Sequence, residues 1–173
     1  VRILLLSLLC LAPVAASAQP AQQAVLETTA GTIVWDLLAD TAPNHVALFV
    51  KTAQEGGFDG TAFHRMVRFG IVQGGDPLTK DPAAREKYGS GGLNKLKPEI
   101  AGELLTQGAV AAVQVPGKPD SGGAQFFICV TPQAALDGQF TVFGRVVEGI
   151  GIVTKISEAP VDAAGKATER IEM

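Results

Sequence analysis

The sequence predicts a mainly β fold, in which an antiparallel sheet closes into a barrel and two helices pack against it. Short β-rich runs recur along the chain, turns rich in Gly, Pro, Asp and Asn separate them, and only two segments have helical periodicity. The 173 residues are 47% hydrophobic and 18% charged. This composition supports one domain with its own core, and no internal repeat divides the chain.

The first predicted elements are a β-hairpin and a helix. Two β-rich runs, residues 25–29 and 32–38, flank a turn at Ala30-Gly31, and large apolar side chains alternate along the second run. The helix, of about three turns, is predicted by apolar residues at the spacing of one helical face, namely Val46, Phe49, Val50 and Ala53. Gly56-Gly57 ends it.

Strands and turns make up most of the remaining chain. The predicted strands cover residues 62–67, 71–73, 109–115, 125–130, 141–147 and 169–173. A short second helix is predicted around Val153. The polar segment 76–98 fits neither pattern, so we predict a long surface loop with one helical turn at 83–88. Loops of this length in a compact domain are commonly functional.

The N-terminal segment is typical of a secretory signal peptide. Arg2 precedes an apolar run, residues 3–14, that is too short to span a hydrocarbon layer about 30 Å thick. The small residues Ala16-Ser17-Ala18 then supply a cleavage site. We expect cleavage after Ala18, a mature domain over residues 19–173, and a periplasmic or secreted protein with no further membrane span. A buried N-terminal helix is the alternative, which Pro13 disfavours.

Composition excludes several classes of function. Removing residues 1–18 leaves 13 basic and 17 acidic residues, a net charge of −4, and no basic run, so we expect no nucleic-acid partner. Cys129 is the one cysteine of the mature chain, which rules out an intramolecular disulfide. The two histidines, His45 and His64, do not stand at metal-ligand spacing, so we expect no metal and no cofactor. Nothing in the sequence indicates an obligate dimer, and we expect a monomer.

Two separated blocks carry a more specific signal. Phe63-His64-Arg65 is followed after seven residues by Gln73-Gly74-Gly75-Asp76, and a second block runs from Ser121-Gly122-Gly123 to Phe126-Phe127-Ile128-Cys129. Leu136-Asp137-Gly138 and Val142-Phe143-Gly144 follow in order. From residue 25 to residue 173 this arrangement resembles a full cyclophilin domain, a peptidyl-prolyl cis-trans isomerase, of a bacterial and exported kind. The resemblance implies a closed eight-stranded antiparallel barrel with two capping helices.

The resemblance also implies an activity and its residues. An X-Pro bond turns slowly because amide resonance sets a barrier of roughly 18–20 kcal/mol, and no bond has to be made or broken. The catalyst therefore needs a hydrogen-bond donor that favours a pyramidal prolyl nitrogen, and an apolar pocket for the ring. By resemblance, Arg65 and Gln73 are catalytic. The substrate-binding residues implied are Phe63, Phe69, Ile71, Gln125, Phe127, Leu136 and Phe140. The expected partners are proline-containing unfolded or flexible polypeptides.

The sequence departs from the family at a few positions. The usual pocket Phe falls on Gly70, with Phe69 one place earlier, so either a bulge brings Phe69 into the pocket or another side chain supplies that wall. Pro116 has no N–H to offer a substrate backbone. Ala135 stands where drug-sensitive members carry Trp, so we expect weak cyclosporin binding. We expect His64, next to Arg65 on a strand, to face the other way.

Two alternatives to the enzyme remain open. The departures at Gly70 and Pro116 would suit a weakly catalytic or non-catalytic module that holds proline-containing segments in the same groove. A barrel that carries a small apolar molecule would need a hollow interior, whereas the large apolar side chains of this chain are expected to fill it.

Overall fold

The computed structural model describes residues 22–173, so the predicted signal peptide and its cleavage site lie outside the described residues. The strands are β1 (Gln23–Thr28), β2 (Gly31–Leu37), β3 (Ala62–Val67), β4 (Ile71–Gly74), β5 (Ala109–Ala112), β6 (Phe126–Cys129), β7 (Val142–Glu148) and β8 (Lys166–Glu172). They form one sheet in the order β1-β2-β7-β5-β6-β4-β3-β8, and every pairing is antiparallel. The mainly β prediction is confirmed.

The sheet is curled but not closed, which corrects the predicted closed barrel. Its edges are β1 and β8, which meet only beside the β1–β2 turn: the Thr29 N–H donates to the Glu172 carbonyl (3.0 Å), and the Glu172 N–H donates to Thr29 Oγ1 (3.1 Å). The end of β8 instead pairs with the segment before β3, where the Met173 N–H donates to the Thr61 carbonyl (2.8 Å). This pairing leaves β1 with one ladder partner, β2.

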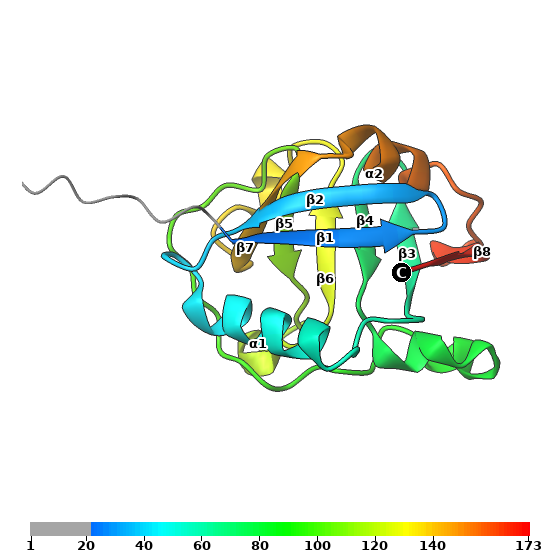
Figure 1. The fold of residues 1–173 in the computed structure, drawn as a ribbon, viewed down its shortest axis with the longest axis horizontal. Coiled ribbons are helices and arrows are strands. Elements are labelled where there is room, and N and C mark those ends of the chain that lie inside the picture. The colour runs from blue at the N-terminus through cyan, green and yellow to red at the C-terminus, as the bar shows by residue number, and fades with distance from the viewer. Residues whose placement is uncertain (1–21) are drawn as a thin grey trace, which may run out of the picture.

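Two α-helices flank the curled sheet (Figure 1). Helix α1 (Pro43–Gln54) and α2 (Ile150–Ser157) cover opposite ends of it. Ala42 at the N-terminus of α1 offers no side-chain cap. Glu99 supplies it from a distant loop, because its carboxylate accepts the backbone N–H groups of Asn44 and His45, both at 3.0 Å.

The long loop after β4 contains more structure than the one predicted turn. It forms two short 3₁₀ helices, η1 (Pro77–Lys80) and η2 (Pro82–Lys87). Asp76 and Asp81 cap them by accepting the N–H groups two residues ahead, at 2.8 and 2.9 Å. Each helix therefore begins with an Asp-Pro pair, a start signal at the scale of a single turn.

The strands bury side chains on both faces. Along β6, Phe126 and Ile128 lie in the inner core, which fills the curl of the sheet, whereas Phe127 and Cys129 lie on the opposite face. On that face they belong to the pocket-side cluster, defined as Leu105, Ala109, Ala111, Phe127, Cys129 and Val142. The inner core is aromatic around Trp35, whose ring lies 5.5 Å from that of Phe49 and 5.7 Å from that of Phe126. The large side chains thus fill the interior, as predicted.

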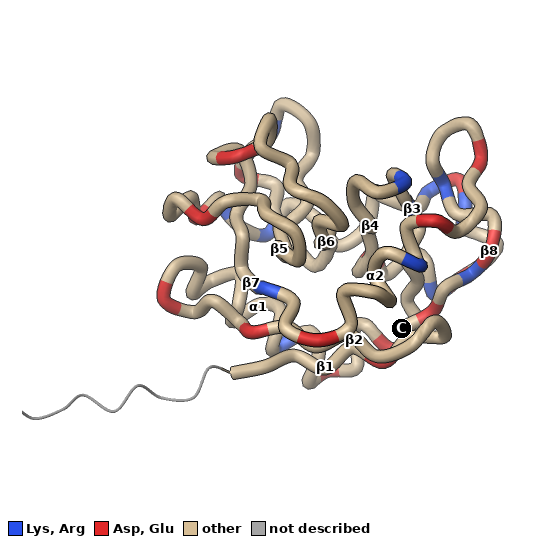
Figure 2. Tube along the Cα trace, turned by 90° about the horizontal axis from the view of Figure 1, so that it is seen from above, with Lys and Arg blue, Asp and Glu red and all other residues tan. Residues whose placement is uncertain are grey.

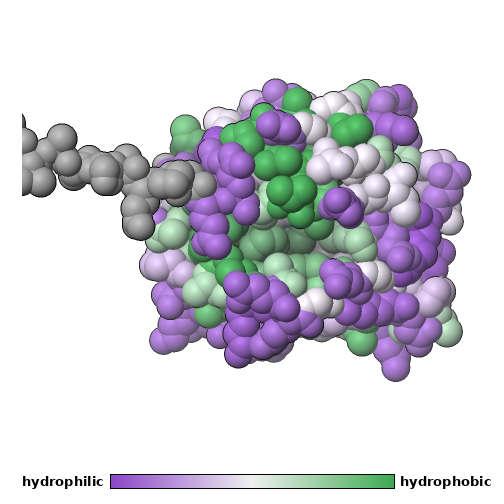
Figure 3. Space-filling model, in the orientation of Figure 1, coloured by the Kyte–Doolittle hydropathy of each residue, from purple (hydrophilic) through white to green (hydrophobic). Residues whose placement is uncertain are grey.

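The surface of residues 22–173 has an apolar hollow beside β1 and a mixed distribution of charges. The hollow lies between β1 and α1, has a volume of about 610 Å³, and is visible on the front face in Figure 3. Basic residues gather around β3, β4 and β8 but alternate with acidic ones (Figure 2). Within residues 22–173, no helix has the length and hydropathy needed to cross a membrane.

Candidate active site

A pocket of about 730 Å³ opens on the outer face of β3, β4 and β6. It contains six of the nine predicted site residues: Arg65, Ile71, Gln73, Phe127, Leu136 and Phe140. They converge because β3 and β4 form a hairpin in which Arg65 lies directly opposite Gln73, and Gln73 lies opposite Phe127 of β6. Residues that are far apart in the sequence thus share one row across three strands.

The floor of the pocket is apolar and closely packed. Phe127 is 3% exposed, and its ring meets that of Phe140 edge to face at 5.2 Å. Ile71, Leu136 and Phe140 pack on the pocket-side cluster, which fixes the floor against the sheet. Such a surface can hold a small apolar ring but offers it no hydrogen bond.

Arg65 is the one charged side chain that lines the pocket. It is exposed, and among residues 22–173 no hydrogen bond or ion pair engages its guanidinium. A guanidinium carries five N–H donors and keeps its charge at all physiological pH values. The pocket therefore combines an apolar floor with a set of free donors at its edge.

A chain of amide hydrogen bonds lies beneath Arg65, and its direction follows from one backbone carbonyl. The Gly91 carbonyl can only accept, so Gln125 must present Nε2 to it, at 2.7 Å. This turns Gln125 Oε1 toward Gln73, whose Nε2 donates to it at 3.0 Å. Both glutamines are buried, with 9% (Gln73) and 0% (Gln125) exposed. Gln73 therefore directs its amide nitrogen toward Gln125, and its Oε1 remains free to accept another hydrogen bond.

The loop that carries Gly91 is held by a buried carboxylate. Asp76 is fully buried, and its Oδ2 accepts the N–H groups of Gly89 (2.6 Å) and Gly91 (3.2 Å). A Cβ on Gly91 would collide with Asp76 Oδ1, so this position requires glycine. Gly89 and Ser90 line the pocket, which gives the predicted functional loop a structural role at the site.

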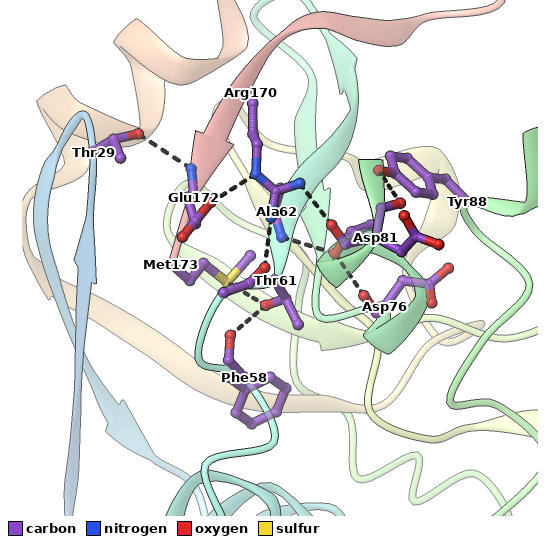
Figure 4. A network of polar contacts seen from close by, with 12 residues as sticks. Thr29, Phe58, Thr61, Ala62, Asp76, Asp81, Tyr88, Arg170, Glu172 and Met173 are labelled. Atoms are coloured by element: carbon purple, nitrogen blue, oxygen red, sulfur yellow. Dashed lines mark hydrogen bonds and ion pairs between the residues drawn. The ribbon is translucent and has the colours of Figure 1, made fainter. Parts of the chain in front are cut away.

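Hydrogen bonds made by Thr79 and Arg170 connect Asp76 to the sheet (Figure 4). Thr79 Oγ1 donates to the Asp76 carbonyl (2.6 Å) and accepts the Ala62 N–H at the start of β3 (2.8 Å). From β8, Arg170 donates to the carbonyls of Thr79 and Gly60, both at 2.6 Å. The pocket wall is therefore connected by hydrogen bonds to both β3 and β8.

His64 lies beside the amide chain, which corrects the expectation that it faces away from Arg65. Its Nε2 is 3.4 Å from Nε2 of Gln73, the cross-strand partner of Arg65. The register between β3 and β8 shifts between Phe63 and Arg65, and this irregularity breaks the simple alternation of side chains. Burial lowers the pKa of His64 below its ordinary value, against the opposing effect of Asp76.

Two of the predicted substrate contacts lie elsewhere. Phe63 is 1% exposed and packs in the inner core against Phe126, at a ring distance of 6.4 Å, because the same register shift turns it inward. Phe69 sits in the β3–β4 turn with φ of 54° and is 47% exposed. The Arg68 guanidinium covers its ring at 5.0 Å. No bulge carries Phe69 into the pocket. The ninth predicted residue, Gln125, lies behind the pocket, where it supports Gln73.

Several lining residues are absent from the predicted site residues, namely Val67, Leu93, Val113, Gln114, Val115 and Gln133. Val67 follows Arg65 at the two-residue period of a strand, a signal that could have indicated it. Gly70 and Pro116, noted as departures, also line the pocket. Leu93 and Gln133 come from loops whose course the sequence does not specify. Residues 113–115 were predicted to end a strand, but β5 ends at Ala112 and they lie in the loop that follows.

Among residues 22–173, no metal site and no reactive cysteine accompany the pocket. No group of three or more His, Cys, Asp or Glu side chains there could hold a metal ion. Burial raises the pKa of the Cys129 thiol to about 12, so this cysteine is a small buried side chain rather than a thiolate.

Comparisons with known proteins agree on one family. The model of the cyclophilin type peptidyl-prolyl cis-trans isomerase family matches residues 24–173. A Neurospora crassa peptidyl-prolyl cis-trans isomerase-like 1 is 32% identical over 153 residues, which cover 88% of this chain and 91% of the relative. A Dictyostelium discoideum peptidyl-prolyl cis-trans isomerase is 36% identical over 136 residues, 79% of this chain and 85% of the relative.

The fold has a counterpart among solved structures. A Cryptosporidium parvum cyclophilin type isomerase, crystallised in the presence of the dipeptide Ala-Pro, superposes with a TM-score of 0.78. It is 24% identical, and the match covers 88% of this chain and 95% of that chain. The family match over residues 24–173 and the two relatives that are 32% and 36% identical show that the chain belongs to the cyclophilin-type peptidyl-prolyl cis-trans isomerases.

Proposed function

We propose that Arg65 is the residue through which this isomerase accelerates rotation of X-Pro bonds. The observation that carries the proposal is an unpaired guanidinium at the edge of an apolar pocket. As the X-Pro bond leaves planarity, the lone pair of the prolyl nitrogen withdraws from the carbonyl and becomes a hydrogen-bond acceptor. A donor that meets this lone pair stabilises the transition state more than the planar ground state, which is the requirement for catalysis.

The apolar floor has the complementary task of holding the proline ring. Ile71, Phe127, Leu136 and Phe140 offer contacts that do not change as the bond turns, so the ring stays fixed while the preceding carbonyl rotates. Binding of this kind lowers KM without lowering the barrier. We therefore assign kcat mainly to Arg65 and substrate affinity mainly to the floor.

The two glutamines position Arg65 in this proposal. Gln73 is its direct cross-strand partner, and the bond to Gln125 prevents the amide of Gln73 from turning over. The free Oε1 of Gln73 is then an acceptor beside the guanidinium or beside a substrate N–H. An acceptor there can hold the guanidinium in place as the bond turns, which reduces the entropy lost when it meets the transition state.

The biological setting that we propose is the folding of exported proteins in the periplasm or outside the cell. It rests on the signal-peptide pattern of residues 1–18. Unfolded chains contain X-Pro bonds in both isomers, and these interconvert over tens to hundreds of seconds. The substrates proposed are proline-containing segments of unfolded or flexible chains, met by a monomeric enzyme that needs no cofactor or metal.

The test is the isomerisation rate of a short X-Pro reporter peptide with wild type, Arg65→Ala and Arg65→Lys. We expect Arg65→Ala to lower kcat/KM by roughly 100-fold, equivalent to about 2.7 kcal/mol of transition-state stabilisation. Arg65→Lys should recover a minor part, because an ammonium lacks the planar fork. Arg68→Ala is the matched control, since Arg68 lies on the same hairpin but outside the pocket, in an exposed ion pair with Glu158.

Equal rates for folded wild type and Arg65→Ala would contradict the role of Arg65. A folded wild type that binds proline peptides without accelerating them would favour the binding module instead. The position of Pro116 favours this second function, the binding module. Pro116 lines the pocket and has no N–H to donate to a substrate carbonyl.

A further inference from the structure

His64 is a buried titratable side chain next to Arg65 in the sequence, and the mechanism above does not use it. It is 4% exposed. One ring nitrogen, Nε2, is 3.4 Å from Gln73 Nε2, and the other, Nδ1, is buried with no hydrogen-bond partner among residues 22–173. Burying a polar imidazole costs desolvation free energy unless its nitrogens form hydrogen bonds. The buried position of His64 therefore indicates a hydrogen-bonding role.

The direction of the amide chain assigns His64 its hydrogen-bonding role. Gln73 Nε2 has two N–H groups, and one of them donates to Gln125 Oε1. The other points to His64 Nε2, which can accept it only as a neutral imidazole with its proton on Nδ1. Both hydrogens of the Gln73 amide are then used, and Oε1 is left toward the side of Arg65.

We infer that His64 is a positioning residue for catalysis: its neutral Nε2 accepts a hydrogen bond from Gln73 and so fixes which arm of that amide is presented beside Arg65. Gln125 alone would hold one N–H of Gln73. With His64 as well, a half turn of the amide would place Gln73 Oε1 against two acceptors, Gln125 Oε1 and His64 Nε2, instead of against Gln125 Oε1 alone. The inference rests on the proposed role of Arg65.

Charged and titratable groups from four segments of the chain surround His64, and their effects on its pKa oppose one another. The groups that face it or line the small cavity beside it are Arg65 on β3, Asp76 after β4, Arg85 and Tyr88 on and after η2, and Lys166, Glu169 and Arg170 on β8. Burial lowers the pKa of His64 most strongly, Asp76 and the backbone of Ala62 raise it, and Arg65 and Lys166 lower it. The net direction favours the neutral, accepting imidazole at neutral pH.

Protonation of His64 would reverse the role of Nε2. An imidazolium donates from both nitrogens, so Nε2–H would face the N–H of Gln73, and the Gln73 amide would have to turn over and break its bond to Gln125. Because burial lowers the pKa of His64 below the ordinary value of about 6.5, this loss lies on the acid side of that value. Activity is therefore expected to be constant near neutral pH and to fall as the pH decreases.

The first test needs no substitution and uses the ¹⁵N chemical shifts of the imidazoles in the wild-type protein. At neutral pH, His64 is expected to be neutral, with Nδ1 protonated and Nε2 unprotonated. An Nε2–H tautomer or an imidazolium at neutral pH would overturn the inference, because neither form can accept the Gln73 N–H.

The second test compares the pH profile of kcat/KM, from about pH 8 to about pH 5, in His64→Gln and His64→Leu. The Gln variant can place an amide oxygen near the position of Nε2 and does not titrate. It should keep activity within about threefold of wild type and lose the part of the acid decline that His64 causes, whereas the Leu variant should lose roughly tenfold in kcat at neutral pH. His45→Gln, at the other histidine of the chain, is the control and should keep the wild-type acid decline.

Variants are compared only after circular dichroism shows that they are folded. Wild-type activity and acid decline in folded His64→Leu would overturn the inference, as would equal losses in the Gln and Leu variants. Either result leaves the role of Arg65 intact, since that role is tested independently by Arg65→Ala. A failure of the proposed function would instead appear as an Arg65→Ala variant with wild-type activity.

Discussion

The two histidines are almost equally buried, with 3% (His45) and 4% (His64) exposed, but they belong to opposite kinds of cluster. At the start of α1, the Glu99 carboxylate meets four donors, including His45 Nδ1 at 2.6 Å and two backbone N–H groups. At the pocket, His64 joins a chain of neutral amides that ends in a free acceptor and an unpaired guanidinium. The first cluster is closed, and the second is open on one side.

The difference shows how burial can serve stability or function. A closed cluster satisfies every buried polar group inside the protein, so its hydrogen bonds contribute directly to the free energy of unfolding. An open cluster leaves groups that only a substrate, or a neighbouring side chain during the reaction, can satisfy. Substitutions in the two clusters should therefore have different effects. A change at Glu99 should lower the free energy of unfolding, and a change at Gln73 should lower the rate of isomerisation.

After Arg65→Ala, the largest effect on the rate is expected from Gln73→Leu. This change removes both hydrogen bonds of the Gln73 amide and the acceptor beside Arg65, so kcat/KM should fall by roughly 30-fold, about 2 kcal/mol of transition-state stabilisation. The measurement is the rate with the reporter peptide, alongside a urea unfolding curve. A variant that loses stability but keeps its rate would show that the amide chain is a closed structural cluster after all.

Glu99→Gln should have the opposite effect, a loss of stability with an unchanged rate of isomerisation. Desolvation raises the pKa of Glu99, but hydrogen bonds from His45 and Asn44 outweigh it and hold the pKa below the ordinary range. A lowered pKa in the folded state stabilises the protein above the unfolded pKa of about 4.3, and this contribution is lost as the pH falls through the folded value. Glu99→Gln should therefore be less stable at pH 7 by about 2 kcal/mol, with the rate of the folded fraction unchanged.

The pH dependence provides the control for this prediction. The gap in unfolding free energy between wild type and Glu99→Gln should be constant near neutral pH and should narrow below about pH 4. A gap that is the same at acid and neutral pH would mean that the charge of Glu99 does not stabilise α1.

The smallest effect is expected from Phe69→Gly, outside both clusters. Phe69 adopts a positive φ that glycine tolerates better, and its ring is exposed rather than in the pocket. Relief of backbone strain and the greater freedom of glycine in the unfolded chain oppose each other, so stability should stay within about 1 kcal/mol of wild type. The kcat/KM should stay within about twofold. A loss of tenfold or more would restore Phe69 to the substrate site.

The parts of the fold that depend on local pattern could be predicted from the sequence. The alternation of Ile33, Trp35 and Leu37 predicted β2, and the helical spacing of Val46 and Phe49 predicted α1. The start of β8 was placed three residues late, because residues 166–170 are largely polar and show no alternation of buried side chains. The open edge between β1 and β8 depends on long-range register, which no local pattern specifies.

The candidate site could be predicted to the extent that its motif residues share one row of the sheet. Arg65, Gln73 and Phe127 do so, and they meet in the pocket. Phe63 was wrongly assigned because an irregularity in the β3–β8 pairing interrupts the two-residue period on which the assignment depends. The bond from Gln125 to the Gly91 carbonyl joins residues 34 positions apart and involves the backbone of a loop, so the side-chain sequence carried no signal for it.

The most direct test of the central claim is exchange NMR on an X-Pro peptide at equilibrium with a catalytic amount of the protein. The method detects interconversion of the cis and trans forms without a coupled reaction or an initial imbalance. We predict exchange cross-peaks with wild type, which uncatalysed isomerisation over tens of seconds or longer cannot produce, and their loss with Arg65→Ala. Equal exchange with both folded proteins would contradict the account, because the pocket would then turn the bond without its guanidinium.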